Sequence, residues 1–166
     1  MSDPIKQCGE CSLCCKVMGI PELGKPKDTP CVHIIPGKGC DIYGERPPSC
    51  RAFACHWILD RAVGDTWKPS NCHMVVEVKP RSTVIHIDPD FAEVWKSEPY
   101  FSEIKAMAKA GLTKGSMTLV IEKLRTIVVL PDEEIDLGFL GPNARIAMTP
   151  HKTPNGMRWQ PHVMKQ

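Results

Sequence analysis

The amino-acid sequence predicts an α+β fold, in which a loop-rich cysteine segment at the N-terminus packs on a small, mainly antiparallel sheet with one or two helices. Two observations indicate this class. All nine cysteines fall within the first 72 residues, where proline and glycine recur too often for long helices or strands. From residue 73 onward, β-branched runs alternate with a stretch of helical periodicity, the pattern of a sheet with helices.

We divide the chain into three parts and expect them to form one compact unit. Residues 1–72 are the cysteine-rich, metal- or cluster-binding segment, which has too little apolar periodicity to pack a core alone. Residues 73–150 are a small β-β-α-β-β unit that supplies the core. Residues 151–166 are a polar, turn-rich tail, which we expect to be loosely held.

Runs of β-branched residues predict the strands of the sheet. The first two, at 73–78 and 83–88, are separated by Lys-Pro-Arg-Ser and indicate a hairpin. Runs at 117–123 and 125–130 predict a second strand pair, and 144–148 predicts an added edge strand.

Between the two strand pairs, the sequence predicts one or two helices. Asp90 with Glu93 resembles a capping box at the start of the first helix. Apolar residues then recur at helical spacing from Phe101 to Leu112, and Gly111 suits the end of that helix.

Eight of the nine cysteines are concentrated between positions 8 and 55. The opening MSDPIKQ lacks the apolar region of a secretory signal, and no run of about 18 apolar residues occurs, so we expect a cytoplasmic protein without a membrane span. In a reducing cytosol, closely spaced cysteines are more often metal ligands than disulfides. Disulfides remain the alternative.

The spacing of the first cysteines favours iron–sulfur ligation over zinc. Cys8, Cys11 and Cys14 are three residues apart, which resembles the cluster-binding run of bacterial ferredoxins. Zinc sites more often use two separated C-x-x-C pairs, and this segment has such a pair at one end only. Cys15 directly follows Cys14, and adjacent side chains tend to diverge, so the two can serve different metals. Eight thiolates equal two four-sulfur sites, and we expect a 4Fe–4S cluster or zinc as the cofactor.

Four stretches, CGECSLCC, PCVHI, GCDIYGERPPSC and RAFACHW, closely resemble the CxxCxxCC cysteine-cluster family, the YkgJ-like proteins, which are described as zinc- or iron-chelating. A related cysteine motif occurs in flagellin lysine N-methylase, which is regarded as an iron–sulfur protein. The resemblance covers roughly residues 8–57 and leaves Cys72 outside the pattern. It implies that the metal ligands are Cys8, Cys11, Cys14, Cys15, Cys31, Cys40, Cys50 and Cys55.

Two arginines close to the cysteines are candidates for binding the cofactor. Arg46 and Arg51 flank Cys50, where a guanidinium can offset the charge of clustered thiolates and donate hydrogen bonds to sulfur. The alternative is two surface arginines with partly buried stems.

The remaining residues of interest have simpler expected roles. We expect three aromatic residues to form the core between the two halves, although they could also keep water from a cluster. Three histidines near cysteines are alternative ligands that two full four-sulfur sites would not need. Cys72 is expected to be a buried free thiol. The aromatic residues are Tyr43, Phe53 and Trp57, and the histidines are His33, His56 and His73.

Composition and motifs together favour a non-catalytic metalloprotein. The net charge of +2 comes without a clustered basic stripe, which argues against nucleic acid as a partner. Four sulfurs per metal leave no open ligand position, so we expect electron transfer, metal or redox sensing, or cluster delivery, with metal ions or a cluster and a protein redox partner. The alternatives are a cluster-dependent enzyme such as a protein methyltransferase, or a zinc-stapled interaction module.

Overall fold

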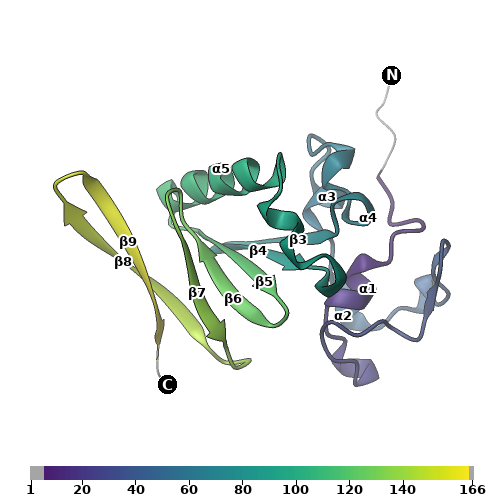
Figure 1. Cartoon of the computed structure of the whole chain (residues 1–166). Coiled ribbons are helices and arrows are strands. Elements are labelled where there is room, and N and C mark those ends of the chain that lie inside the picture. Colours follow the sequence, from purple (N-terminus) through teal and green to yellow (C-terminus); the bar gives the residue numbers. More distant parts are fainter. Residues whose placement is uncertain (1–5, 165–166) are drawn as a thin grey trace.

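The predicted α+β class is confirmed by a computed structural model, which describes residues 6–164. A five-stranded sheet stands at the centre, with the cysteine segment at one end and a separate hairpin at the other (Figure 1). Across the described residues, no helix is long and apolar enough to cross a membrane.

The sheet has the strand order β3-β4-β5-β6-β7 and is mainly antiparallel, as predicted. Its two predicted hairpins are β3 (Met74–Lys79) with β4 (Ser82–Ile87), and β5 (Met117–Glu122) with β6 (Arg125–Val129). The central pair β4–β5 is parallel, which requires a crossover between them. The segment between these strands supplies that crossover as the 3-10 helix η4 (Pro89–Lys96) and helix α5 (Tyr100–Thr113).

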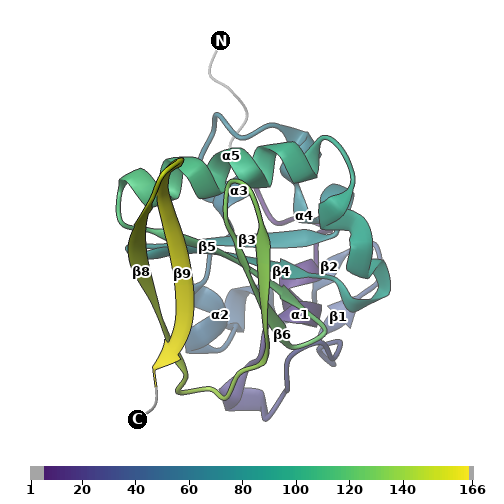
Figure 2. The same ribbon diagram turned by 60° about the vertical axis from the view of Figure 1, so that its left-hand side comes forward.

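Helix α5 covers one face of the sheet and creates the main hydrophobic core (Figure 2). Its residues Ile104 and Ala108 are buried, which agrees with the helical periodicity in the sequence. Trp95 from η4 is fully buried, and its indole nitrogen donates to Glu122 at 3.1 Å. The buried cluster consists of Trp67, Cys72, Met74, Val76, Ile85, Ile87, Trp95, Ile104, Ala108, Val120 and Val129.

The cysteine segment is built from very short elements, as its prolines and glycines predict. Its helices are α1 (Leu13–Val17), α2 (Pro48–Ala52), α3 (His56–Leu59) and α4 (Pro69–Cys72), joined by 3-10 turns. A small hairpin pairs β1 (Ile34–Ile35) with β2 (Gly39–Cys40). The segment packs on β3 through a second apolar cluster, in which Leu13, Val17 and Trp57 surround Val75. The expected packing of the two halves is therefore confirmed.

Three details of the sheet unit differ from the sequence prediction. The capping residue of η4 is Asp88, whose carboxylate accepts from the Asp90 amide, so the predicted capping box at Asp90 is wrong. Helix α5 continues past Gly111 to Thr113. A fifth strand, β7 (Glu134–Phe139), joins the edge of the sheet beside β6. Its acidic composition and its glycine gave no strand pattern.

The predicted loose tail after Pro150 is wrong for residues 151–164. They belong to a long hairpin of β8 (Arg145–Thr153) and β9 (Gly156–Met164), which also absorbs the strand predicted at 144–148. The hairpin pairs only with itself and does not extend the central sheet as an edge strand. Most of its residues are exposed, and prolines at positions 150, 154 and 161 favoured a turn-rich interpretation even though polar and apolar residues alternate along β9. The Pro154-Asn155 pair that suggested a tail is its tight turn, and Gly156 begins β9.

Candidate metal centre

All eight cysteines predicted as ligands line one cavity of about 190 Å³ in the cysteine segment. They come from separate local structures that the fold brings together. Cys8 and Cys11 lie in the loop before α1, and Cys14 and Cys15 lie within that helix. The other four arrive from the β1–β2 hairpin, α2 and the start of α3, and they are Cys31, Cys40, Cys50 and Cys55.

Backbone contacts hold these loops against one another. The Cys11 amide donates to the Cys8 carbonyl at 2.8 Å, which closes the C-x-x-C turn. The Cys31 amide donates to the Cys15 carbonyl at 3.1 Å, which ties the approach to β1 to helix α1. Gly39 lies so close to the first loop that a Cβ atom there would be 2.2 Å from the Gly9 carbonyl oxygen. Only glycine fits this contact, which places the end of the β1–β2 hairpin beside the first two cysteines.

The ninth cysteine lies outside the cavity, as predicted. Cys72 has no exposed surface and belongs to the main core, and its Sγ donates to the Met74 carbonyl at 3.3 Å. Burial raises the pKa of this thiol to about 11. Cys72 is therefore a buried, protonated thiol near neutral pH.

The thiols that raise one another's pKa fall into two overlapping sets among the cavity cysteines. Burial raises the pKa of Cys40 and of Cys50, and in both cases Cys15 and Cys31 are the thiols that raise it further. Burial likewise raises the pKa of Cys55, but there the contributing thiols are Cys8 and Cys11. We name these the Cys15 group, which is Cys15, Cys31, Cys40 and Cys50, and the Cys55 group, which is Cys8, Cys11, Cys14 and Cys55.

Cys14 and Cys15 connect the two groups. A hydrogen bond with Cys15 raises the pKa of Cys14, and its next largest electrostatic neighbours are Cys8 and Cys11. The same hydrogen bond lowers the pKa of Cys15 to about 7, with the positive charges of Lys25 and Arg46 acting in the same direction. Cys15 therefore has the strongest thiolate character of the two.

The two arginines predicted at the site have different positions. Arg46 lines the cavity, with its guanidinium 3.8 Å from the Tyr43 ring centroid and its Nε donating to the Tyr43 carbonyl at 2.9 Å. Arg51 is exposed and is absent from the cavity lining. The structure thus places Arg46 beside the cysteines and leaves Arg51 in the surface position that the sequence offered as the alternative.

The aromatic residues and histidines near the site differ in whether they line the cavity or lie at the surface. Trp57 is buried in the second apolar cluster and Phe53 packs against it, so both serve as core between the halves and as cavity wall. Tyr43 is 48% exposed, so the prediction of a core role for it is wrong. Its place in a one-turn 3-10 helix at the surface leaves one ring face to Arg46. Of the histidines, His33 lines the cavity, where its Nδ1 lies 3.0 Å from Asp41.

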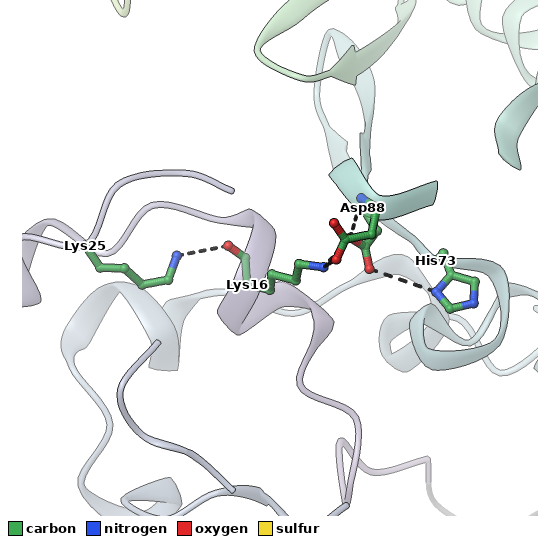
Figure 3. Close-up of polar contacts among 5 residues, drawn as sticks. Lys16, Lys25, His73 and Asp88 are labelled. Atoms are coloured by element: carbon green, nitrogen blue, oxygen red, sulfur yellow. Dashed lines mark hydrogen bonds and ion pairs between the residues drawn. The ribbon is translucent and has the colours of Figure 1, made fainter. Parts of the chain in front are cut away.

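An ion-pair network anchors the cysteine helix to the sheet unit (Figure 3). Lys16, the residue after Cys15, reaches the Asp88 carboxylate at 2.5 Å and the Asp90 carboxylate at 2.6 Å. The side chain of Asp88 is only 6% exposed, and its other oxygen lies 4.0 Å from His73 Nδ1. Lys16 therefore neutralises a buried carboxylate at the end of β4 while it holds α1 in place.

The donor set matches a thiophilic metal in its chemistry. All nine cysteines are free thiols, and sulfur ligands select zinc, copper(I) and iron–sulfur clusters. Between residues 6 and 164, no three His, Cys, Asp or Glu side chains are already arranged as a metal-holding group. The thiols surround a common space without a formed coordination shell, so metal ligation would require side-chain adjustment.

Comparisons of the chain with family models, characterised proteins and solved structures found no match. The family resemblance carried by the cysteine motif therefore stays a prediction, and the function rests on the site itself.

Proposed function

We propose that this protein binds metal through the eight cavity cysteines and acts in electron transfer, metal or redox sensing, or cluster delivery. One observation carries the proposal. Eight cysteines spread from position 8 to position 55 line a single cavity, whereas the ninth is buried in a separate apolar core. Clustering of this kind brings together the soft ligands that iron–sulfur clusters and zinc prefer.

The division into two groups supports two four-sulfur sites. The Cys15 group and the Cys55 group each contain four thiols, which is the number that a tetrahedral zinc or a 4Fe–4S cluster takes. Cys14 and Cys15 are assigned to different groups, but a hydrogen bond joins their side chains, which therefore do not diverge as expected. Their assignment to different metals stays a prediction. A metal with four sulfur ligands has no position for substrate, and this favours a non-catalytic role.

Iron–sulfur is the form that we favour, with zinc as the alternative. The triple spacing of Cys8, Cys11 and Cys14 supports a cluster. Much of the remaining cavity wall is apolar and would limit solvent access; it includes Ile20, Leu23, Phe53, Trp57 and Ile58. The corresponding partner is a protein that exchanges electrons or a cluster with this site.

The deciding experiment is elemental analysis with acid-labile sulfide on protein purified without oxygen. Two 4Fe–4S clusters require about eight iron and eight sulfide per chain, with a brown colour that air bleaches. About two zinc per chain without sulfide would reject the cluster and retain the eight ligands. Protein that holds neither metal under these conditions would reject the proposal.

A further inference from the structure

A second cavity lies between the β8–β9 hairpin and the central sheet, and we call it the hairpin cleft. Its volume is about 660 Å³, and it shares no lining residue with the cysteine cavity. The hairpin stands at the end of the molecule opposite the cysteine segment (Figure 1). The cleft has an apolar wall on each side. The sheet unit contributes Leu112, Met117 and Leu119, and the hairpin contributes Ile146, Met148 and Trp159.

The hairpin has little packing of its own to hold it in place. A two-stranded hairpin is marginally stable alone in water, and β8 and β9 pair only with each other. An ion pair of 3.1 Å between Arg158 and Glu133 ties it to the residue before β7. Ile146, Met148 and Trp159 line the cleft and are each only partly buried. A ligand in the cleft would therefore bury further apolar surface on the hairpin and on the sheet unit together.

The cleft also presents hydrogen-bond donors that have no partner. Among residues 6–164, the exposed guanidinium groups of Arg81 and Arg145 make no hydrogen bond, ion pair or ring contact. The indole nitrogen of Trp159 is likewise without a partner in the described chain. The indole nitrogens of the other three tryptophans each donate to a carboxylate. Those pairs are Trp57 with Asp65, Trp67 with Glu103, and Trp95 with Glu122.

The charge around the cleft is positive and largely uncompensated. No aspartate or glutamate belongs to the described lining of the cleft. From residue 137 to residue 164 the sequence has no acidic side chain, whereas it includes Arg145, Lys152 and Arg158. Of these three, Arg158 is the one compensated by Glu133. The cleft thus combines apolar walls with free cationic donors, which complement a ligand that has an apolar body and an anionic head group.

We propose that the hairpin cleft binds a small amphiphilic anion, whose apolar body fills the cleft and whose carboxylate or phosphate head group bonds to Arg81 and Arg145. Small-molecule sites commonly have volumes of about 300–1,000 Å³, with mostly apolar walls and a few polar groups. Arginine forms paired hydrogen bonds with both carboxylate and phosphate. Trp159 offers an apolar ring and an N–H donor in one side chain. The inference does not depend on the proposed function of the cysteine cavity.

The test titrates the full chain, by calorimetry, with decanoate and with decyl phosphate, both below the concentrations at which they form micelles. We expect saturable binding of one molecule per chain for at least one of these anions, and the stronger of the two identifies the head group. Its eight-carbon analogue should bind about 15-fold more weakly, because each buried methylene contributes about fourfold to affinity. Decyltrimethylammonium, which has the same chain and the opposite charge, should not bind saturably.

Two substitutions test the head-group contacts, and a third is their control. Arg81→Gln and Arg145→Gln should each weaken binding of the anion by about fivefold, the upper range for an exposed charge pair. Lys152→Gln is matched to them, because Lys152 is an exposed cation of the same hairpin that does not line the cleft. It should leave the affinity unchanged. At a free ligand concentration of about ten times the dissociation constant, amide protection of β8 and β9 should rise by about tenfold.

Several results would overturn the inference. Absence of saturable binding by either anion would do so, as would equal binding of decyltrimethylammonium. Equal weakening in Lys152→Gln and in the two arginine variants would show attraction to net charge without a site. Ligand-induced protection confined to the cysteine segment would assign the ligand to the other cavity. A dimer in light scattering whose hairpin amides are protected without ligand would show that a second copy of the chain fills the cleft.

Discussion

The two halves of the molecule differ in what holds them together. The sheet unit has a continuous apolar core, in which Met74, Ile85, Trp95 and Ile104 are fully buried. The cysteine segment has helices of at most five residues, which are far too short to be stable alone. At its centre is a cavity lined by thiols. Apolar burial can thus account for the stability of the sheet unit. The cysteine segment requires contacts with the sheet and, in our proposal, metal.

The contact between the halves is mixed in character, and Trp67 and Cys72 of the cysteine segment belong to the main apolar core. Val75 of β3 packs against apolar residues of α1 and α3, and Lys16 forms an ion pair with Asp88 at the end of β4. These contacts explain why α1 is well placed before any metal is considered. They do not reach the β1–β2 hairpin or α2, which carry cysteines of the Cys15 group.

The largest expected effect is that metal removal destabilises the cysteine segment and leaves the sheet unit unchanged. A free metal concentration of about 1,000 times the dissociation constant stabilises the folded site by about 4 kcal/mol. Amide protection in the cysteine segment should therefore fall by up to about a thousandfold when a chelator removes the metal. Strands β3 to β6 should keep their protection. Hydrogen exchange of the chain with and without metal measures both, and equal protection of the cysteine segment in the two states would contradict the proposed dependence.

A core substitution should have the opposite pattern. Ile104→Ala removes a fully buried side chain between α5 and the sheet and should lower the free energy of unfolding of the sheet unit by about 2–5 kcal/mol. Val78→Ala, at a position that is 50% exposed, should change it by about 0.5 kcal/mol or less. Denaturant unfolding measures both. A loss in Ile104→Ala that depends on metal would break the division between the halves.

How far the sequence predicts this structure depends on the kind of signal that a residue carries. The spacing of Cys8, Cys11 and Cys14 indicated a metal site, and the family resemblance implied the full set of eight ligands. Periodicity identified α5 and four strands of the sheet. The β8–β9 hairpin was missed because prolines at positions 150, 154 and 161 indicated turns and hid the alternation along β9. The bonds from Lys25 to the Lys16 and Met18 carbonyls were missed because they depend on a loop folding back to α1, and nothing in a Pro-Gly-Lys-rich stretch indicates that contact.

The assignment of the cysteines to two groups could not be predicted from the sequence either. Spacing favours Cys8, Cys11 and Cys14 as one set, and Cys8 and Cys11 are, after Cys15, the thiols that raise the pKa of Cys14. The fourth thiol that we assign to that group is Cys55 and not Cys31, which is nearer in the sequence. Helix α3 shares an apolar cluster with α1, whereas the Cys31 amide donates to the Cys15 carbonyl. Such pairing is a property of the tertiary structure.

The smallest effect compares two single thiols in metal-free, folded protein. The pKa of Cys15 is lowered to about 7, so its thiolate, and hence its alkylation rate, should rise as the pH passes upward through about 7. The pKa of Cys72 is raised to about 11, so Cys72 should stay protonated and unmodified at pH 8. Mass spectrometry after brief alkylation between pH 6 and pH 9 gives both profiles, and faster labelling of Cys72 would refute this contrast.

Metal content of three serine variants tests the central claim most directly. Serine oxygen is a poor substitute for thiolate at a soft metal, whereas serine in place of a buried free thiol has only a modest packing and polarity cost. Cys14→Ser and Cys50→Ser, one from each group, should therefore each sharply reduce the metal bound per purified chain. Cys72→Ser should retain the metal content of the parent. If Cys72→Ser loses as much metal as Cys14→Ser, the division into eight ligands and one core thiol is wrong.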